Sequence, residues 1–200
     1  MSSRHHGTGK RSYRHQELLY DADIATPTHA ERAFTLVSQQ GTATLCTLAL
    51  EPEGHPYGSF VTFGMWEKRP IFLISALAEH TRNLKKDGRC SLLVSEPGDG
   101  DPLARGRVTL VGQCLQLKGD ERDQAKAAYL EAHPRAAYFA DYTDFALWAL
   151  DVERIRYIGG YGRMSWVESE DWSHSDADPI APHSEGICKH MNEDHADSLV

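Results

Sequence analysis

The sequence predicts an α+β protein in which strands dominate, built as an antiparallel barrel with helices packed around it. Six or seven short apolar runs follow one another along the chain, which excludes an all-helical fold. Turn-like sequences such as EPEGHP and EKRP separate neighbouring runs, so a doubly wound parallel sheet is disfavoured. A chain of 200 residues with 40% hydrophobic content is long enough to bury a core of this kind.

The first predicted element is a helix from Thr28 to Gln40. Thr28 and Glu31 form a capping box, in which each side chain accepts the backbone N–H of the other residue. Apolar residues then recur at helical spacing, and Gly41 ends the helix.

The apolar runs that follow are interpreted as strands, because they are short and bounded by turn residues. In chain order these strands cover residues 42–50, 57–66, 71–74, 90–95, 107–117, 145–157 and 164–167. A polar, alanine-rich helix is predicted over residues 120–132. It ends at His133, because the residue before a proline avoids helical dihedral angles.

Composition divides the chain into four segments. Residues 1–25 form a basic segment that we expect to be flexible, and residues 26–167 form the barrel domain. Residues 168–186 are acidic, contain Pro179 and Pro182 and lack periodicity, so we expect a poorly ordered linker. Residues 187–200 open a helix, which we expect to begin a small C-terminal helical domain that the chain leaves unfinished.

Charge and hydropathy restrict the classes of partner. A formal net charge of −8 argues against a nucleic-acid-binding protein, which needs a basic face. No apolar run approaches the roughly 20 residues of a membrane span, and the N-terminus lacks the apolar core of a secretory signal. We therefore expect a cytoplasmic protein with neither a membrane nor a nucleic acid as partner.

Residues 69–94 carry the most informative pattern. An apolar strand ends at Ser75, a short helix with His80, Thr81 and Arg82 begins, and a second apolar strand follows. Backbone N–H groups at a helix N-terminus attract anions, and these three side chains can add charge-assisted hydrogen bonds. The pattern leaves two interpretations open, an oxyanion site and a plain solvated turn.

The same segment resembles the phosphate-binding region of the FMN-binding split-barrel family, the fold of pyridoxamine 5′-phosphate oxidase. The closest resemblance is to its haem-utilisation (HugZ-type) branch, which carries an LxSxLAxHTxNL run. The matching residues here are Leu73, Ser75, Leu77, Ala78, His80, Thr81, Asn83 and Leu84. The likeness extends from about Ala30 to Trp166, and ICKHMNEDHADSL, from Ile187, resembles the opening of a small domain that often follows this barrel.

The resemblance implies a flavin site. FMN would lie along one strand, its phosphate would be held at the short helix, and a polar residue and a glycine-rich run, GGYGR, would lie near the ligand. Where the family oxidases use a Ser-Arg-Lys cluster, this chain has Ala78, Glu79 and His80, and it lacks their strand-borne arginine near Ser59. The candidate cofactor-binding residues are Ser59, Phe60, Val61 and Thr62 on the strand, His80, Thr81 and Arg82 on the helix, and Arg107, Gly160 and Arg163.

Histidines carry the alternative of haem binding. A haem iron needs a single neutral imidazole as ligand. His174 and His183 lie just after the barrel, where the relatives place an axial histidine, so each is a candidate. We expect no zinc site, because His190 and His195 are five positions apart and would point about 140° away from each other on a helix.

Three functions are therefore in competition. The leading hypothesis is a homodimeric, FMN-dependent oxidoreductase that acts on a small-molecule substrate, with the flavin at the subunit interface. A C₂ interface would bring Trp148 or the run of residues 159–163 beside the partner's phosphate site. The alternatives are a haem-binding or haem-utilisation protein with one axial histidine, and a non-catalytic regulatory interaction protein on the same fold.

Overall fold

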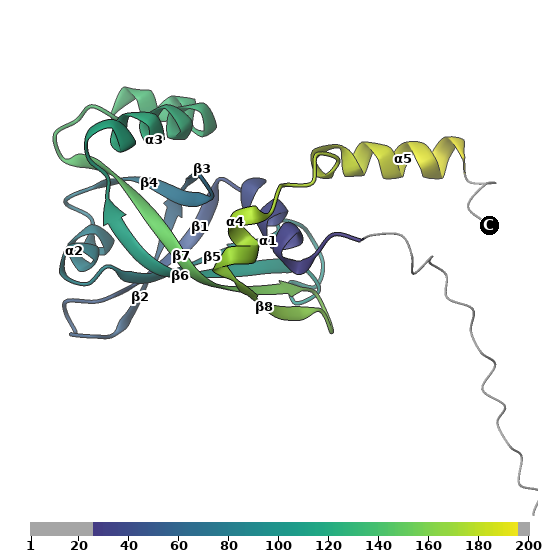
Figure 1. Ribbon diagram of the computed structural model, residues 1–200, viewed down its shortest axis with the longest axis horizontal. Helices are drawn as coiled ribbons and strands as arrows, with labels where there is room; N and C mark the ends of the chain where they lie inside the picture. Colours follow the sequence, from purple (N-terminus) through teal and green to yellow (C-terminus); the bar gives the residue numbers. More distant parts are fainter. Residues whose placement is uncertain (1–25, 196–200) are drawn as a thin grey trace, which may run out of the picture.

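The computed structural model describes residues 26–195, so the predictions for residues 1–25 and 196–200 lie outside the described part of the chain. Within it, eight strands form one antiparallel sheet that curls into a barrel (Figure 1). The strands are β1 (Thr42–Leu48), β2 (Pro56–Thr62), β3 (Gly64–Trp66), β4 (Arg69–Ser75), β5 (Arg89–Ser95), β6 (Gly106–Gln116), β7 (Phe145–Gly159) and β8 (Met164–Glu168). The α-helices are α1 (His29–Ser38), α2 (Glu79–Lys86), α3 (Gly119–Ala132), α4 (Ser169–His174) and α5 (Ser184–Asp194), with 3₁₀ turns η1 (Pro134–Tyr138) and η2 (Ala181–His183).

The order of the strands explains why the sheet closes. Neighbouring strands run β2-β1-β5-β6-β7-β4-β3, and β8 pairs with β7. The two ends of this path, β2 and β3, are separated in the chain by Phe63 alone, so they must lie close together. The sheet therefore curls back on itself, and the predicted fold class, an α+β split barrel flanked by helices, is confirmed.

The longest ladder, between β6 and β7, contains a bulge at which one position must be glycine. Val111 pairs with Arg154 and Gly112 pairs with Val152, so Glu153 is the extra residue. A Cβ atom on Gly112 would lie 1.9 Å from the carbonyl oxygen of Asp151, too close for any side chain. Glycine is thus required where the barrel wall bends.

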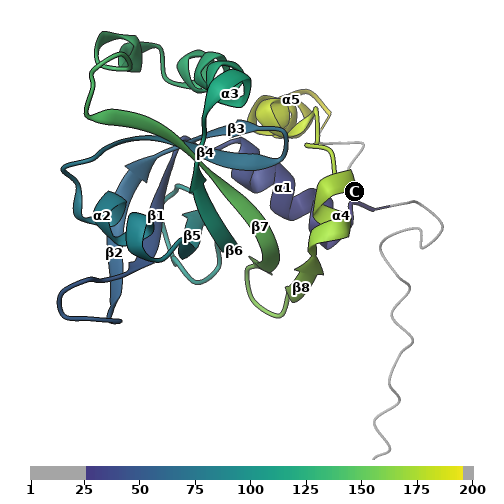
Figure 2. The ribbon, with the colours of Figure 1, turned by 60° about the vertical axis from the view of Figure 1, so that its left-hand side comes forward.

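Helices pack around the barrel (Figure 2). The predicted capping box of α1 is confirmed: the Thr28 N–H donates to Glu31 Oε2 at 2.7 Å, and the Glu31 N–H donates to Thr28 Oγ1 at 3.1 Å. Helix α1 buries Phe34 and Val37 in the barrel core. Helix α3 covers a second apolar cluster around Tyr129, and α2 packs against β1.

The expected linker over residues 168–186 is wrong in its first part. Residues 169–174 form α4, whose Trp172 is 3% exposed and packs edge-on against Phe34 with ring centroids 5.0 Å apart. The Trp172 Nε1–H donates to the Lys68 carbonyl at 2.9 Å. A single buried tryptophan therefore anchors a segment that has no periodic apolar pattern, which is why the sequence indicated disorder.

The chain after α4 is exposed from Asp176 to Ile180, and α5 starts at Ser184 rather than at the expected Ile187. None of the residues of α5 is buried, and the helix extends away from the barrel (Figure 1). Over residues 26–195, no helix has the length and apolar character that crossing a bilayer demands.

Candidate functional site

Two residues of the 69–94 segment, Ser75 and Asn83, use their side chains to hold α2 in place. Ser75 Oγ donates to Asp144 Oδ2 at 2.8 Å and accepts the Leu77 N–H at 3.1 Å. The side chain of Asn83 is fully buried: its Nδ2 donates to Thr47 Oγ1 at 2.9 Å, and its Oδ1 accepts the Leu50 N–H at 3.1 Å. Because all these polar groups are satisfied inside the protein, Ser75 and Asn83 serve the fold.

His80 and Thr81 differ from them. His80 Nδ1 lies 3.2 Å from Ser59 Oγ, whereas His80 Nε2 and Thr81 Oγ1 are buried and find no hydrogen-bond partner among residues 26–195. Burial lowers the pKa of His80, so its imidazole is neutral at physiological pH. Buried polar atoms without partners are rare in folded proteins, and they indicate where a ligand or water binds.

The three candidate phosphate residues of α2 leave the helix in different directions, because successive helical positions are about 100° apart. His80 faces Ser59 on β2, and Thr81 lines a cavity together with Trp148 on β7. Arg82 is exposed and pairs with Glu79. Within the described chain the neutral His80 and the paired Arg82 offer little net positive charge to a phosphate.

The candidate residues on β2 alternate between two faces, as strand geometry requires. Val61 is buried and Ser59 is half-buried on one face, whereas Phe60, which is 76% exposed, and Thr62 lie on the other. The Thr62 hydroxyl is 2.7 Å from the Tyr129 hydroxyl, so it links β2 to α3. The side chains that the structure brings together from this group are thus Ser59 and His80.

Arg107, Gly160 and Arg163 lie at the other end of the barrel wall. The nine-residue step along β6 from Arg107 to Gln116, which lies near α2, corresponds to about 30 Å of strand. Arg107 Nη1 donates to the carbonyl oxygens of Leu103 and Arg105, both at 3.3 Å. Gly160 has a φ of +89°, and its backbone passes against Ala104.

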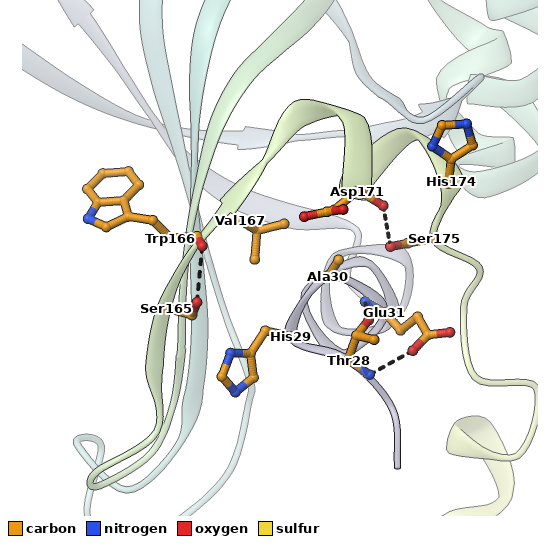
Figure 3. A pocket seen from close by; sticks show the side chains of 10 residues that line it. All are labelled: Thr28, His29, Ala30, Glu31, Ser165, Trp166, Val167, Asp171, His174 and Ser175. Atoms are coloured by element: carbon orange, nitrogen blue, oxygen red, sulfur yellow. Dashed lines mark hydrogen bonds between the residues drawn. The ribbon is translucent and has the colours of Figure 1, made fainter. Parts of the chain in front are cut away.

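The haem-ligand candidate His174 lies at the rim of a cavity of about 380 Å³ between the start of α1 and the β8–α4 segment (Figure 3). His174 Nδ1 is 2.9 Å from the Glu170 carbonyl oxygen. A carbonyl oxygen only accepts, so Nδ1 is the donor in this contact, and Nε2 is the nitrogen left for another partner. The other candidate, His183, is exposed at the end of η2.

Two side chains differ from their expected settings. Trp148 was a candidate for the subunit interface, but it is 4% exposed, and its Nε1 has no partner in residues 26–195. The sequence of this apolar strand gave no sign that the Trp148 indole N–H would be buried without a partner among the described residues. The expectation that His190 and His195 point apart was wrong: their rings lie 5.0 Å apart, because His195 follows the end of α5.

Comparison with known proteins places this barrel in a family. The model of a family described as "CREG, beta-barrel" matches residues 25–174. Over 157 residues the chain is 32% identical to "Non-canonical heme oxygenase HOZ, chloroplastic" of Arabidopsis thaliana, covering 76% of this chain and 48% of the relative. The chain thus spans about half the length of that curated protein.

Two solved structures extend the comparison. One, described as a heme binding protein from Mycobacterium smegmatis, is 44% identical with a TM-score of 0.83, over 88% of this chain and 72% of the other. HutZ of Vibrio cholerae, described as a heme storage protein, is 24% identical with a TM-score of 0.55, over 62% of this chain and 89% of the other, and it supports the fold alone. The chain belongs to the CREG β-barrel family.

Proposed function

We propose that this protein binds haem, with the imidazole of His174 as the axial ligand of the iron. The names of the Arabidopsis and Mycobacterium smegmatis relatives both refer to haem, and both proteins are more than 30% identical to this chain. Haem breakdown, as the name of the Arabidopsis relative describes, is the activity that we propose to follow from binding.

The observation that carries this proposal is the 2.9 Å contact between His174 Nδ1 and the Glu170 carbonyl oxygen. The His174 Nδ1–H is held by the Glu170 carbonyl, so the Nε2 lone pair is the one available to a metal. Histidines that bind metals usually have their other ring nitrogen held by a carbonyl or carboxylate in this way. Bound iron would supply the redox and oxygen chemistry, while the protein would supply the ligand and the cavity wall.

Haemin titration of the full chain tests the proposal. Wild-type protein should give a saturable Soret band with the visible bands of a histidine-ligated haem. His174→Ala should weaken binding by about tenfold or more, since even outer partners of metal ligands contribute 10–100-fold to affinity. Added imidazole should restore the wild-type spectrum of that variant.

His183→Ala is the matched control, because His183 is also exposed and lies nine positions further along the chain. It should bind haemin as wild type does. An unchanged spectrum and affinity in His174→Ala would exclude His174, and a loss confined to His183→Ala would transfer the role to His183.

FMN is the second candidate, and one observation favours it. Ser59 and His80 form a polar pair, and the His80 Nε2 is buried without a partner in the described chain, so its N–H could donate to a flavin phosphate. In that case FMN must bind more tightly than riboflavin, and His80→Gln must reduce the difference. Equal, weak binding of both flavins would exclude this candidate.

A further inference from the structure

A second, smaller cavity lies beneath α2. Its volume is about 160 Å³, and its walls come from α2, the end of β4, the end of β6 and the start of β7. Residues with polar side-chain atoms in the lining are Thr81 and Lys85 from α2, Gln116 from β6, Thr143 and Asp144 just before β7, and Trp148 from β7. It shares no lining residue with the cavity at His174.

Two buried donors in this lining have no hydrogen-bond partner within the described part of the chain. Thr81 is 1% exposed and Trp148 is 4% exposed. Across residues 26–195, neither the Thr81 hydroxyl nor the Trp148 Nε1–H meets a hydrogen-bonding group. An indole N–H can only donate, and a threonine hydroxyl can donate as well. An occupant that satisfies the indole N–H must therefore offer a hydrogen-bond acceptor, and a carbonyl or carboxylate oxygen is the commonest acceptor that can also take the Thr81 hydroxyl.

Charge and size restrict the occupant further. Lys85 and Asp144 bring opposite formal charges to the lining, and Asp144 Oδ2 already accepts the Ser75 hydroxyl. This balance fits a neutral or singly charged guest better than a phosphate dianion. The volume of 160 Å³ equals about five water molecules at roughly 30 Å³ each, which is enough for a very small organic molecule.

We propose that this cavity binds a compact molecule with a carbonyl or carboxylate oxygen, and that Thr81 and Trp148 donate to that oxygen. The site is independent of the haem proposal, because it uses a different cavity and different residues. It also gives a role to the Thr81 hydroxyl, which has no hydrogen-bond partner among residues 26–195.

The indole N–H resonance of Trp148 reports on the site directly. The sequence contains 4 tryptophans, so a ¹⁵N-correlated spectrum of the full chain should show that number of indole signals, and Trp148→Phe identifies the relevant one. Titration with acetamide or acetate should shift the Trp148 signal in a saturable way and leave the other indole signals in place. Tighter binding of acetamide would indicate a neutral carbonyl ligand, and tighter binding of acetate would indicate a carboxylate ligand.

Thr81→Val, which replaces the hydroxyl with a methyl group of similar size, should weaken binding by about fivefold or more, the effect of losing one hydrogen bond of about 1 kcal/mol. Thr109→Val, on β6 outside this lining, is the control, and Thr81→Ser should retain binding. If neither probe gives saturation, the cavity holds only water and the proposal fails. Inorganic phosphate binding as tightly as acetate, or unchanged affinity in Thr81→Val, would also overturn it.

Discussion

At the scale of single residues, His80 illustrates how burial decides what a side chain can do. As part of an HTR sequence it has the character of a cationic phosphate ligand. In the folded chain its Nδ1 faces Ser59 and the removal of water lowers its pKa, so it is a neutral donor or acceptor. Residue spacing alone contains no information about that desolvation.

Stability should depend on pH through His80. Its folded pKa lies below the ordinary value of 6.5, so as the pH falls the unfolded chain takes up this proton first. The contribution of His80 to the free energy of unfolding is therefore complete above pH 6.5 and is lost as the pH falls from 6.5 through the folded pKa. In urea unfolding at stepped pH, His80→Gln should flatten the decline below pH 6.5.

The exposed His55 supplies the control, because His55→Gln changes the same residue type on the surface. Its stability profile should match that of wild type. A wild-type slope that persists in His80→Gln would show that other groups cause the decline.

At the scale of elements, α4 shows that one contact can hold a short helix. Trp172 inserts between α1 and the strands, where it touches the Phe34 ring and donates to the Lys68 backbone. The side chain of Lys68 also contacts the residues that follow α4, and its Nζ lies 3.1 Å from Asp176 Oδ1. The helix therefore depends on packing against the barrel and not on its own propensity, because six residues form little helix in isolation.

Trp172→Ala should destabilise the protein by about 3–5 kcal/mol, since it removes a large buried aromatic side chain and leaves a cavity. Trp166→Ala is the matched control, because Trp166 is 54% exposed on β8 and its loss should cost less than about 1 kcal/mol. Urea denaturation followed by far-UV circular dichroism measures both. Similar losses in the two variants would contradict the anchoring role of Trp172.

The sequence predicted well those elements that carry a local signal. The Thr28–Glu31 capping box set the start of α1, and turn residues between apolar runs located the strands. Helix α4 escaped prediction because its stability comes from a distant partner, Phe34. The candidate site was predicted only in part, because helix geometry shows that adjacent side chains diverge but does not show which neighbour each of them meets.

At the scale of the whole molecule, the candidate flavin residues of this chain are divided between the two ends of β6. Ser59 and His80 meet near α2, whereas Arg107 and Gly160 lie at the far end. The homodimer that we expect from the family resemblance offers a way to join them, with one end of each subunit beside the opposite end of its partner. Phe60, exposed on the outer face of β2, is an apolar side chain that such an interface could cover.

The position of β7 has a consequence for how the barrel opens. β7 pairs with β6 from Trp148 to Gly159, and on its other side it pairs with β4 from Phe145 to Ala149 and with β8 from Arg154 to Ile158. Releasing β7 as a whole therefore means separating it from three strands. In native-state hydrogen–deuterium exchange, the amides of Leu147, Ala149 and Ile155 should exchange only by global unfolding, whereas those of α5 should exchange at once. Faster exchange in β7 than in β1 would show that the barrel opens along a different seam.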